Sequence, residues 1–581
     1  MDDLVTRYDL VLKGGTVIDG QRTPRYTGDI AISDRRIAQI GSVSESDAAR
    51  VFDARDLVVA PGFIDLHTHF DSQIFWDPWC TMSGWHGITS VVIGNCGFGF
   101  APVRPEDRER AMLTLERNEA VRATTMAAGM PWDWITFPEY LDSVERTPKG
   151  VNVLSYLGLA PVMSWVMGLE DAKGRPATAD EQQRMGALLS EAMDAGACGF
   201  SAQLLGPDSV QRDYDGTPMI TDVMAPDDLL HFARVLGEKG RGFIQVLGAD
   251  FELFEKVAEV SGRPIIWNTL EFAHDQHGNT YGHWRDILRW LEEGNARGLR
   301  LFGHAVTCDI NTEFSLEDWN LFDGMPAWRE VTLGSVPERM RKMRDPALRQ
   351  AIRDVYDGFV AERKAHPDKP VRGGERFLGL PGMRIAEGRT PGVRALEGYT
   401  IGEVAARERK HPVDVLFDLS LSEDLGTFFS HAAVETDMET MREVINSPFV
   451  LPGLSDGGAH MKFLTTGRYP TDFIARLVRD NGLMDLEQAH WRLSGYSAMA
   501  AGFTDRGFLR EGAPADVVVY DYDALRSLPP ERIHDFPAGD WRLAQKAEGY
   551  RLTVVNGEVT FEDGECTGAT PGTLLRHGRS A

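Results

Sequence analysis

The sequence predicts a (β/α)8 barrel accompanied by a small β-sandwich domain that both ends of the chain build together. Over residues 61–505, apolar strand-like runs alternate with helical segments, a pattern typical of parallel pairing. Polar residues able to carry chemistry follow several of these runs, as they do at the carboxyl-terminal face of such barrels. Short strand patterns separated by turn signals occupy residues 1–60 and 506–581 and predict the second domain.

Composition limits the classes of partner. The chain has 581 residues, 43% of them hydrophobic, and a formal net charge of −26. A large negative charge argues against nucleic acid and anionic membrane surfaces as partners, because both are bound by clustered Lys and Arg. No apolar run approaches the ~20 residues that a membrane span needs. The five widely spaced cysteines do not read as a disulfide framework, and the first ten residues lack a signal-peptide core, so we expect a cytoplasmic protein.

Nine runs compete for the eight strand positions of the barrel, so one of them is surplus. The candidate strands are residues 63–66, 90–95, 151–156, 199–201, 243–246, 264–267, 300–303, 427–430 and 450–454. Such barrels typically take about 250 residues and exceed about 400 when they carry insertions. The predicted insertion is residues 311–399, which are polar and broken by Gly and Pro. It is either a helical excursion or a lid over the barrel mouth.

The first strand ends in two histidines. His67 and His69 follow the apolar run 63–66, and alternate side chains of a strand share a face. Two imidazoles converging in this way make half of a divalent metal site, although they are also compatible with two unrelated polar residues closing a strand. Cys96 follows the second strand directly and is flanked by Gly94 and Gly97. A thiolate beside two imidazoles makes a tighter metal site, and the alternative is a small buried apolar side chain.

A carboxylate follows the last strand. Asp456 could ligate a metal and take a proton from water that the metal activates, or it could cap a helix. His460, four residues later, is a candidate for capping, ligation or neither. His304 and His431 end two further strand candidates, and each alone is more typical of a structural histidine.

These motifs resemble a known family. The run Pro-Gly-Phe-Ile-Asp-Leu-His-Thr-His at 61–69 resembles the opening metal motif of the amidohydrolase superfamily. The segments 93–99, 195–201 and 455–457 are similar to the D-aminoacylase (N-acyl-D-amino-acid deacylase) branch. The strands near both chain ends agree with this resemblance, which covers nearly the whole chain outside the insertion.

The resemblance implies a barrel with a small β domain, one or two zinc ions and hydrolysis of an amide. It implies metal ligation by His67, His69 and Cys96, and a role as ligand and general acid/base for Asp456. The family also expects a histidine at the ends of strands five and six and an arginine in the strand-five motif. None stands in the corresponding runs 243–248 and 264–269, which favours a single metal on His67, His69 and Asp456 with Cys96 near.

We therefore expect a metal-dependent amidohydrolase that cleaves an N-acyl amino acid or a related small amide. His304, His460 and Trp267 are the candidate substrate-binding residues, while His274 or His304 are candidates to replace the missing ligands. Aromatic residues near the predicted mouth indicate an apolar or aromatic substrate: Phe75, Trp76, Trp79, Phe98, Phe100, Trp165 and Trp267. The alternatives are a hydrolase of a cyclic amide or ester on the same site, or a catalytically degenerate barrel that acts as a binding module. A homo-oligomer is compatible with the sequence.

Overall fold

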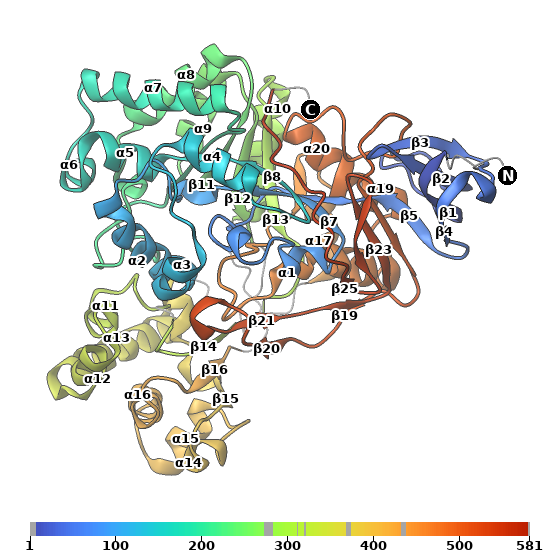
Figure 1. The fold of residues 1–581 in the computed structure, drawn as a ribbon. Helices are drawn as coiled ribbons and strands as arrows, with labels where there is room; N and C mark the ends of the chain where they lie inside the picture. The colour runs from blue at the N-terminus through green and yellow to red at the C-terminus, as the bar shows by residue number, and fades with distance from the viewer. Residues whose placement is uncertain are drawn as a thin grey trace.

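The computed structural model describes residues 7–271, 283–310, 312–318, 321–367, 373–431 and 437–578, and its centre is a barrel of parallel strands (Figure 1). Residue His274 lies outside the described residues. One sheet contains β6 (Phe63–Asp65), β7 (Ile88–Ile93) and β8 (Asn152–Ser155). The other sheet runs in the order β17 (Val450–Gly453), β13 (Leu301–Val306), β12 (Ile265–Leu270), β11 (Phe243–Gly248), β10 (Gly199–Leu204) and β9 (Leu157–Gly158).

The two sheets join into a ring at both of their edges. On one side β8 and β9 are separated by a single residue, Tyr156, and form one stave of the barrel. On the other side a parallel bridge between Thr68 and Gly457 connects the first strand to the last. The described strands therefore give eight staves, and the predicted (β/α)8 fold is confirmed.

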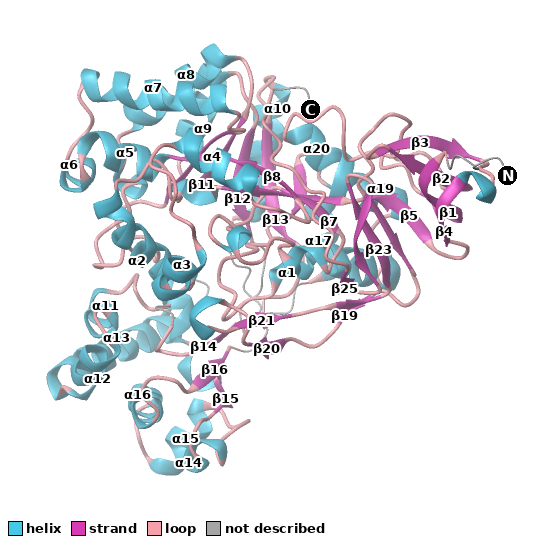
Figure 2. Ribbon diagram, in the orientation of Figure 1, coloured by secondary structure: helices cyan, strands magenta, loops and turns pink. Residues whose placement is uncertain are grey.

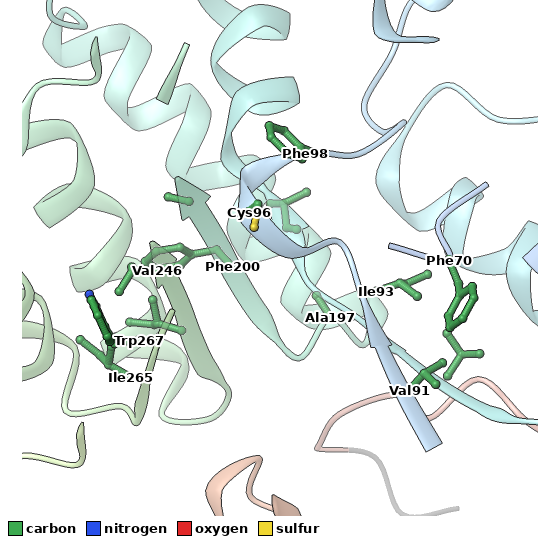
Figure 3. Packing of buried hydrophobic residues seen from close by; sticks show 14 of the residues in the cluster. Phe70, Val91, Ile93, Cys96, Phe98, Ala197, Phe200, Val246, Ile265 and Trp267 are labelled. Atoms are coloured by element: carbon green, nitrogen blue, oxygen red, sulfur yellow. The ribbon is translucent and has the colours of Figure 1, made fainter. Parts of the chain in front are cut away.

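Amphipathic helices cover the outside of the barrel, as Figure 2 shows for α7 (Ala179–Ala195), α8 (Pro226–Lys239) and α9 (Phe251–Ser261). Helix α7 begins at Thr178, whose hydroxyl accepts from the Glu181 backbone N–H in a capping box, a common start signal. Apolar side chains fill the space between strands and helices, and Figure 3 shows part of this core around Phe200, Val246 and Ile265. This packing holds the strands rigidly, so their carboxyl ends can position side chains with precision.

The two ends of the chain pair in a nine-stranded sheet. Strand β5 (Val58–Pro61) lies between β1 (Tyr8–Val17) and β18 (Val517–Tyr520), and β18 pairs on its other edge with β23 (Tyr550–Val555). The alternate residues Val59, Val517 and Val519 pack into the core of this sheet. Because β5 is followed by β6 after only Gly62, the sheet and the first barrel strand form one continuous support for the segment that contains His67.

One predicted barrel strand is wrong. Residues 428–430 form β16 (Phe428–Ser430), which pairs with β14 (Glu313–Phe314) and β15 (Arg384–Glu387) in a separate antiparallel sheet. His431 consequently does not end a barrel strand. The apolar run was misassigned because a short buried strand has the same pattern in any sheet.

The inserted segment has its own core and continues beyond residue 399. It includes α11 (Pro326–Thr332), α12 (Val336–Arg344), α13 (Pro346–Ala365) and α16 (Pro412–Ser422). These helices and the sheet of β14, β15 and β16 enclose a cluster that contains Trp328, Met343 and Phe417. No helix within the described ranges combines the length and the apolar character that crossing a membrane would require.

Candidate metal centre

His67 and His69 lie directly beyond the carboxyl end of β6, where neighbouring strands hold their backbone. The Thr68 hydroxyl donates to the Val92 carbonyl at 2.8 Å, and the His69 N–H donates to the Gly457 carbonyl at 2.7 Å. The Ser455 hydroxyl donates to the His67 carbonyl at 3.2 Å. The segment is thus fixed to β7 on one side and to the loop after β17 on the other, and both imidazoles are buried.

Four potential metal donors converge at this point. One donor atom from each of His67, His69 and Cys96 lies within 4.8 Å of the others. The Cys96 Sγ is 3.5 Å from His67 Nε2, and Asp456 Oδ1 is 3.1 Å from His67 Nε2 and 3.8 Å from His69 Nε2. Zn–N, Zn–O and Zn–S bonds in a tetrahedral site separate the ligand atoms by roughly 3.3–3.8 Å. The N, N, S and O donor types are those that zinc binds, and His67 Nε2 lies close to this ligand spacing from both Cys96 Sγ and Asp456 Oδ1.

A strained loop brings Cys96 to the histidines. Figure 3 shows this residue on the turn after β7, where its backbone is left-handed with a φ of 57°. Gly94 also has a positive φ of 79°, and a Cβ there would lie 2.5 Å from the Tyr156 carbonyl oxygen. The Gly97 N–H donates to the Ser201 hydroxyl at 2.9 Å, which fixes the far side of the turn. The glycines are therefore required by close backbone approach.

Amides occupy the positions on strands five and six where the family resemblance implies histidines. Gln245 on β11 accepts a hydrogen bond from the Cys96 N–H at 2.7 Å, so it supports the strained turn. The carboxamide of Asn268 on β12 contacts His67 Nδ1. Turned with Oδ1 toward the ring, Asn268 accepts from Nδ1–H and leaves the Nε2 lone pair facing Cys96 and Asp456.

The electrostatics of the site favour cation binding. Burial, reinforced by the charge of His67, lowers the pKa of His69 to about 3, so its ring is neutral. Burial alone would raise the pKa of Asp456, but the hydrogen bond with His67 and the neighbouring histidines outweigh it and lower the pKa to about 2. Burial raises the pKa of the Cys96 thiol well above its usual range, and the charge of Asp456 acts in the same direction. A cation at this point supplies the positive charge that draws out the thiolate.

Two of the three predicted substrate-binding residues lie at this centre. His304, within β13, is buried with its ring centroid 6.3 Å from that of His67, and its Nε2 accepts from the Leu454 N–H at 3.1 Å. His460 stands in the loop after Asp456, and its charge acts on both Asp456 and His69.

The third prediction, Trp267, is wrong. Because Asn268 faces the centre of the barrel, the preceding residue faces outward. The Trp267 indole N–H donates to the Gly248 carbonyl at 2.8 Å, and its ring packs against Phe251 and Trp290 between the strands and the outer helices (Figure 3).

The other aromatic residues of the predicted mouth are mostly core as well. Within the described ranges, Phe98 is the one of them that stands against a site residue, with its ring centroid 6.1 Å from that of His69. Phe75 stacks on Trp134, and the Trp79 indole donates to the Ala569 carbonyl. Of the aromatic residues that indicated an apolar or aromatic substrate, only Phe98 is therefore placed to support it.

Sequence reasoning missed Glu119. This residue ends α2 (Arg108–Glu119) and is buried, with its Oε2 3.4 Å from His460 Nε2. Its carbonyl accepts from the His460 N–H at 2.7 Å. Nothing in the local sequence distinguishes it from an exposed helical glutamate, because only the fold brings the end of α2 to the loop after β17.

Comparisons with known proteins agree with this architecture. A family model described as "Amidohydrolase family" (Amidohydro_3) matches residues 50–561. An N-acyl-D-glutamate deacylase of Alcaligenes xylosoxydans xylosoxydans is 35% identical over 578 residues, covering 99% of this chain and 98% of that protein. An N-acyl-D-aspartate deacylase of the same organism is 26% identical and covers 100% of this chain and 97% of its own.

Solved structures show the same fold. A crystal structure of D-aminoacylase has a TM-score of 0.64 at 22% identity and covers 98% of this chain and 99% of its own. The N-acyl-D-glutamate deacylase from Bordetella bronchiseptica, complexed with zinc and a phosphonate inhibitor, has a TM-score of 0.65 at 22% identity and covers 98% of this chain and 100% of its own. The chain therefore belongs to the amidohydrolase family, in the branch that includes D-aminoacylase.

Proposed function

We propose that this protein is a zinc-dependent amidohydrolase that removes the acyl group from an N-acyl-D-amino acid. The observation that carries the proposal is the cluster of His67, His69 and Cys96 at the carboxyl-terminal face of the barrel, with Asp456 beside the two histidines. The names of full-length relatives, which are deacylases of N-acyl-D-aspartate and N-acyl-D-glutamate and a D-aminoacylase, support the reaction class.

We propose one zinc ion for each chain. The amides within β11 and β12 already have protein partners, since Gln245 Oε1 accepts from the Cys96 N–H and Asn268 contacts His67. Neither amide supplies the imidazole nitrogen that a second tight site would need. The remaining donors, His67, His69, Cys96 and Asp456, match the four ligand positions of one ion.

The proposed reaction divides its tasks among the residues of this centre. A bound zinc ion supplies Lewis acidity, which makes water more acidic and polarises the scissile carbonyl. Asp456 accepts a proton from the attacking water and later delivers it to the leaving nitrogen as the C–N bond breaks. The water oxygen and its remaining hydrogen stay on the released carboxylic acid, and the nitrogen leaves as the neutral amine that carries the delivered proton. His304 and His460 are proposed to contact the substrate.

The absent strand-five arginine removes the expected anchor for a substrate carboxylate. Phe98, whose ring lies beside His69, supports an apolar acyl group next to the metal ligands. The alternatives, hydrolysis of a cyclic amide or an ester or a binding role without catalysis, differ from the proposal in measurable ways.

A substrate panel tests the proposal. Purified zinc-loaded protein would be given N-acetyl-D-amino acids with apolar, aromatic and acidic side chains, their L enantiomers, a cyclic amide and an aryl ester. We expect release of free amino acid from D substrates, and at least a thousandfold loss in Asp456→Asn with its fold retained. Asp480→Asn, on the surface beside Arg479, is the matched control. Turnover of only the ester or the cyclic amide, or unchanged turnover in Asp456→Asn, would refute the assignment.

A further inference from the structure

Glu119 is a buried carboxyl group near the metal centre, and the proposed reaction gives it no role. Within the described ranges, the Glu119 side chain has no Lys or Arg at ion-pair distance, and its Oε2 makes no hydrogen bond. The His460 ring faces it, with Nε2 3.4 Å from that oxygen, and Asp456, Asp71 and Cys96 are the other ionisable groups that interact with Glu119. A buried carboxyl group in this setting requires a physical explanation, because its desolvation is costly.

The geometry orders three groups from the interior toward the mouth of the barrel. Side-chain exposure is 2% for Glu119, 11% for His460 and 21% for Asp456. Backbone hydrogen bonds hold this order, because the His460 N–H donates to the Glu119 carbonyl at 2.7 Å and the Ala459 N–H donates to the Asp456 carbonyl at 2.8 Å. His460 thus contacts a fully buried carboxyl group and stands four residues after the proposed general base.

The protonation states follow from this burial. Burial raises the pKa of Glu119 well above its usual range, and the charges of Asp456 and Asp71 raise it further. Burial lowers the pKa of His460, against the opposing effect of Asp456. Burial thus favours the neutral form of both groups. A neutral carboxyl group can donate its proton in a hydrogen bond to an imidazole nitrogen, and the ring then has its hydrogen on the other nitrogen.

We propose that Glu119 is a positioning residue that donates to His460 Nε2 and so holds His460 in the Nδ1-protonated tautomer, with Nδ1–H as the donor to an oxygen of the acyl substrate. This inference rests on the proposed function for the identity of the substrate. A prepositioned N–H donor near the scissile carbonyl stabilises the negative charge that develops on its oxygen. Such a donor is most useful where a single metal ion has to activate both the water and the carbonyl.

The direct test is the tautomer of His460 in the full-length protein. Protein with 15N-labelled histidine would be examined at pH 7 by two-bond 1H–15N correlation, with the His460→Gln variant used to identify the signals. We expect a protonated Nδ1 and an unprotonated Nε2 in the wild type. A protonated Nε2 would overturn the proposal. This measurement needs no substrate, so it stands even if the proposed reaction fails.

Two substitutions separate positioning from packing. In Glu119→Gln the carboxamide N–H still donates to Nε2, so the tautomer persists and kcat/KM stays within about threefold of wild type. In Glu119→Ala the donor is lost, and kcat/KM falls roughly tenfold, mainly through kcat, while the zinc content is unchanged. Glu423→Gln, a buried glutamate in the insertion that accepts from Thr390 and Thr427, is the control and leaves the His460 signals unchanged.

The outcomes are distinguishable even when one variant misfolds. If Glu119→Gln is as impaired as Glu119→Ala, or changes the tautomer, Glu119 acts as an ionised acceptor and the proposal fails. If Glu119→Ala does not fold, the wild-type and Glu119→Gln spectra decide the question alone. Absence of hydrolysis in wild-type protein across the substrate panel would refute the proposed function, whereas a wrong tautomer would refute only the role of Glu119.

Discussion

Replacing Asn268 with alanine should weaken zinc binding about tenfold to a hundredfold, although Asn268 donates no atom to the proposed metal site. The Asn268 side chain, within β12, is buried and contacts His67 Nδ1. When His67 Nε2 faces a cation, Nδ1 carries the hydrogen and needs an acceptor, which the Asn268 side-chain oxygen supplies once the amide is turned toward the ring.

The magnitude follows from this one hydrogen bond. Removing the acceptor leaves a buried N–H unsatisfied, which costs about 1–3 kcal/mol. It also frees the His67 ring to rotate, so Nε2 is no longer held 3.5 Å from the Cys96 Sγ and 3.1 Å from Asp456 Oδ1. Both effects act on the metal-bound state, and together they correspond to the loss of affinity given above.

Chelator competition with metal-free protein measures this affinity directly. Asn268→Asp is the informative partner variant, because a carboxylate is a stronger acceptor for Nδ1–H and should keep or increase zinc affinity. Asn295→Ala, in helix α10 (Trp284–Ala296) on the outside of the barrel, controls for the loss of an asparagine. Unchanged affinity in Asn268→Ala, or a large loss in Asn268→Asp, would refute the reasoning.

Three further predictions concern the same centre and its surroundings. Cys96→Ala should lower zinc affinity while preserving the fold, and full zinc content after dialysis against a weak chelator would make Cys96 structural. Gly94→Ala should destabilise the protein by roughly 1–3 kcal/mol in thermal denaturation, because a Cβ at a φ of 79° meets the Tyr156 carbonyl; an unchanged midpoint would contradict the close approach. Burial raises the pKa of Asp222 to about 6, against hydrogen bonds from Leu205 and Gln203. The folded state therefore binds this proton more tightly than the unfolded chain, and the stabilisation present below about pH 4 is lost as pH rises to 6, by at most ~3 kcal/mol. Asp222→Asn should lack this component, so the difference in unfolding free energy between variant and wild type should change between pH 4.5 and 7, and a constant difference would contradict the pKa.

Much of the fold could be predicted because its pattern is local. Alternating apolar runs and helical segments indicate parallel strands, and the carboxyl ends of parallel strands meet at one face. The site combines His67 and Cys96 with Asp456, which lies far along the chain from both. Each of the three follows a strand, so the sequence alone could predict that they lie close together. The surplus strand at 428–430 was not, because a buried apolar run does not specify which sheet it joins.

The errors within the site arose from orientation and from tertiary contacts. Trp267 and Asn268 are adjacent, and a shift of one residue in a strand exchanges the inside of the barrel for the outside. The assignment of Trp267 to the mouth therefore depended on a register that the sequence does not reveal. Glu119 reaches His460 only because α2 ends beside the loop after β17, a contact that no local motif indicates.

Zinc titration of metal-free protein, with amide hydrolysis followed at each addition, tests the central claim most directly. Hydrolysis of the best N-acyl-D-amino acid should rise with added zinc and reach its maximum at one equivalent per chain. A maximum that requires two equivalents, or hydrolysis that is independent of zinc, would contradict a single catalytic zinc ion.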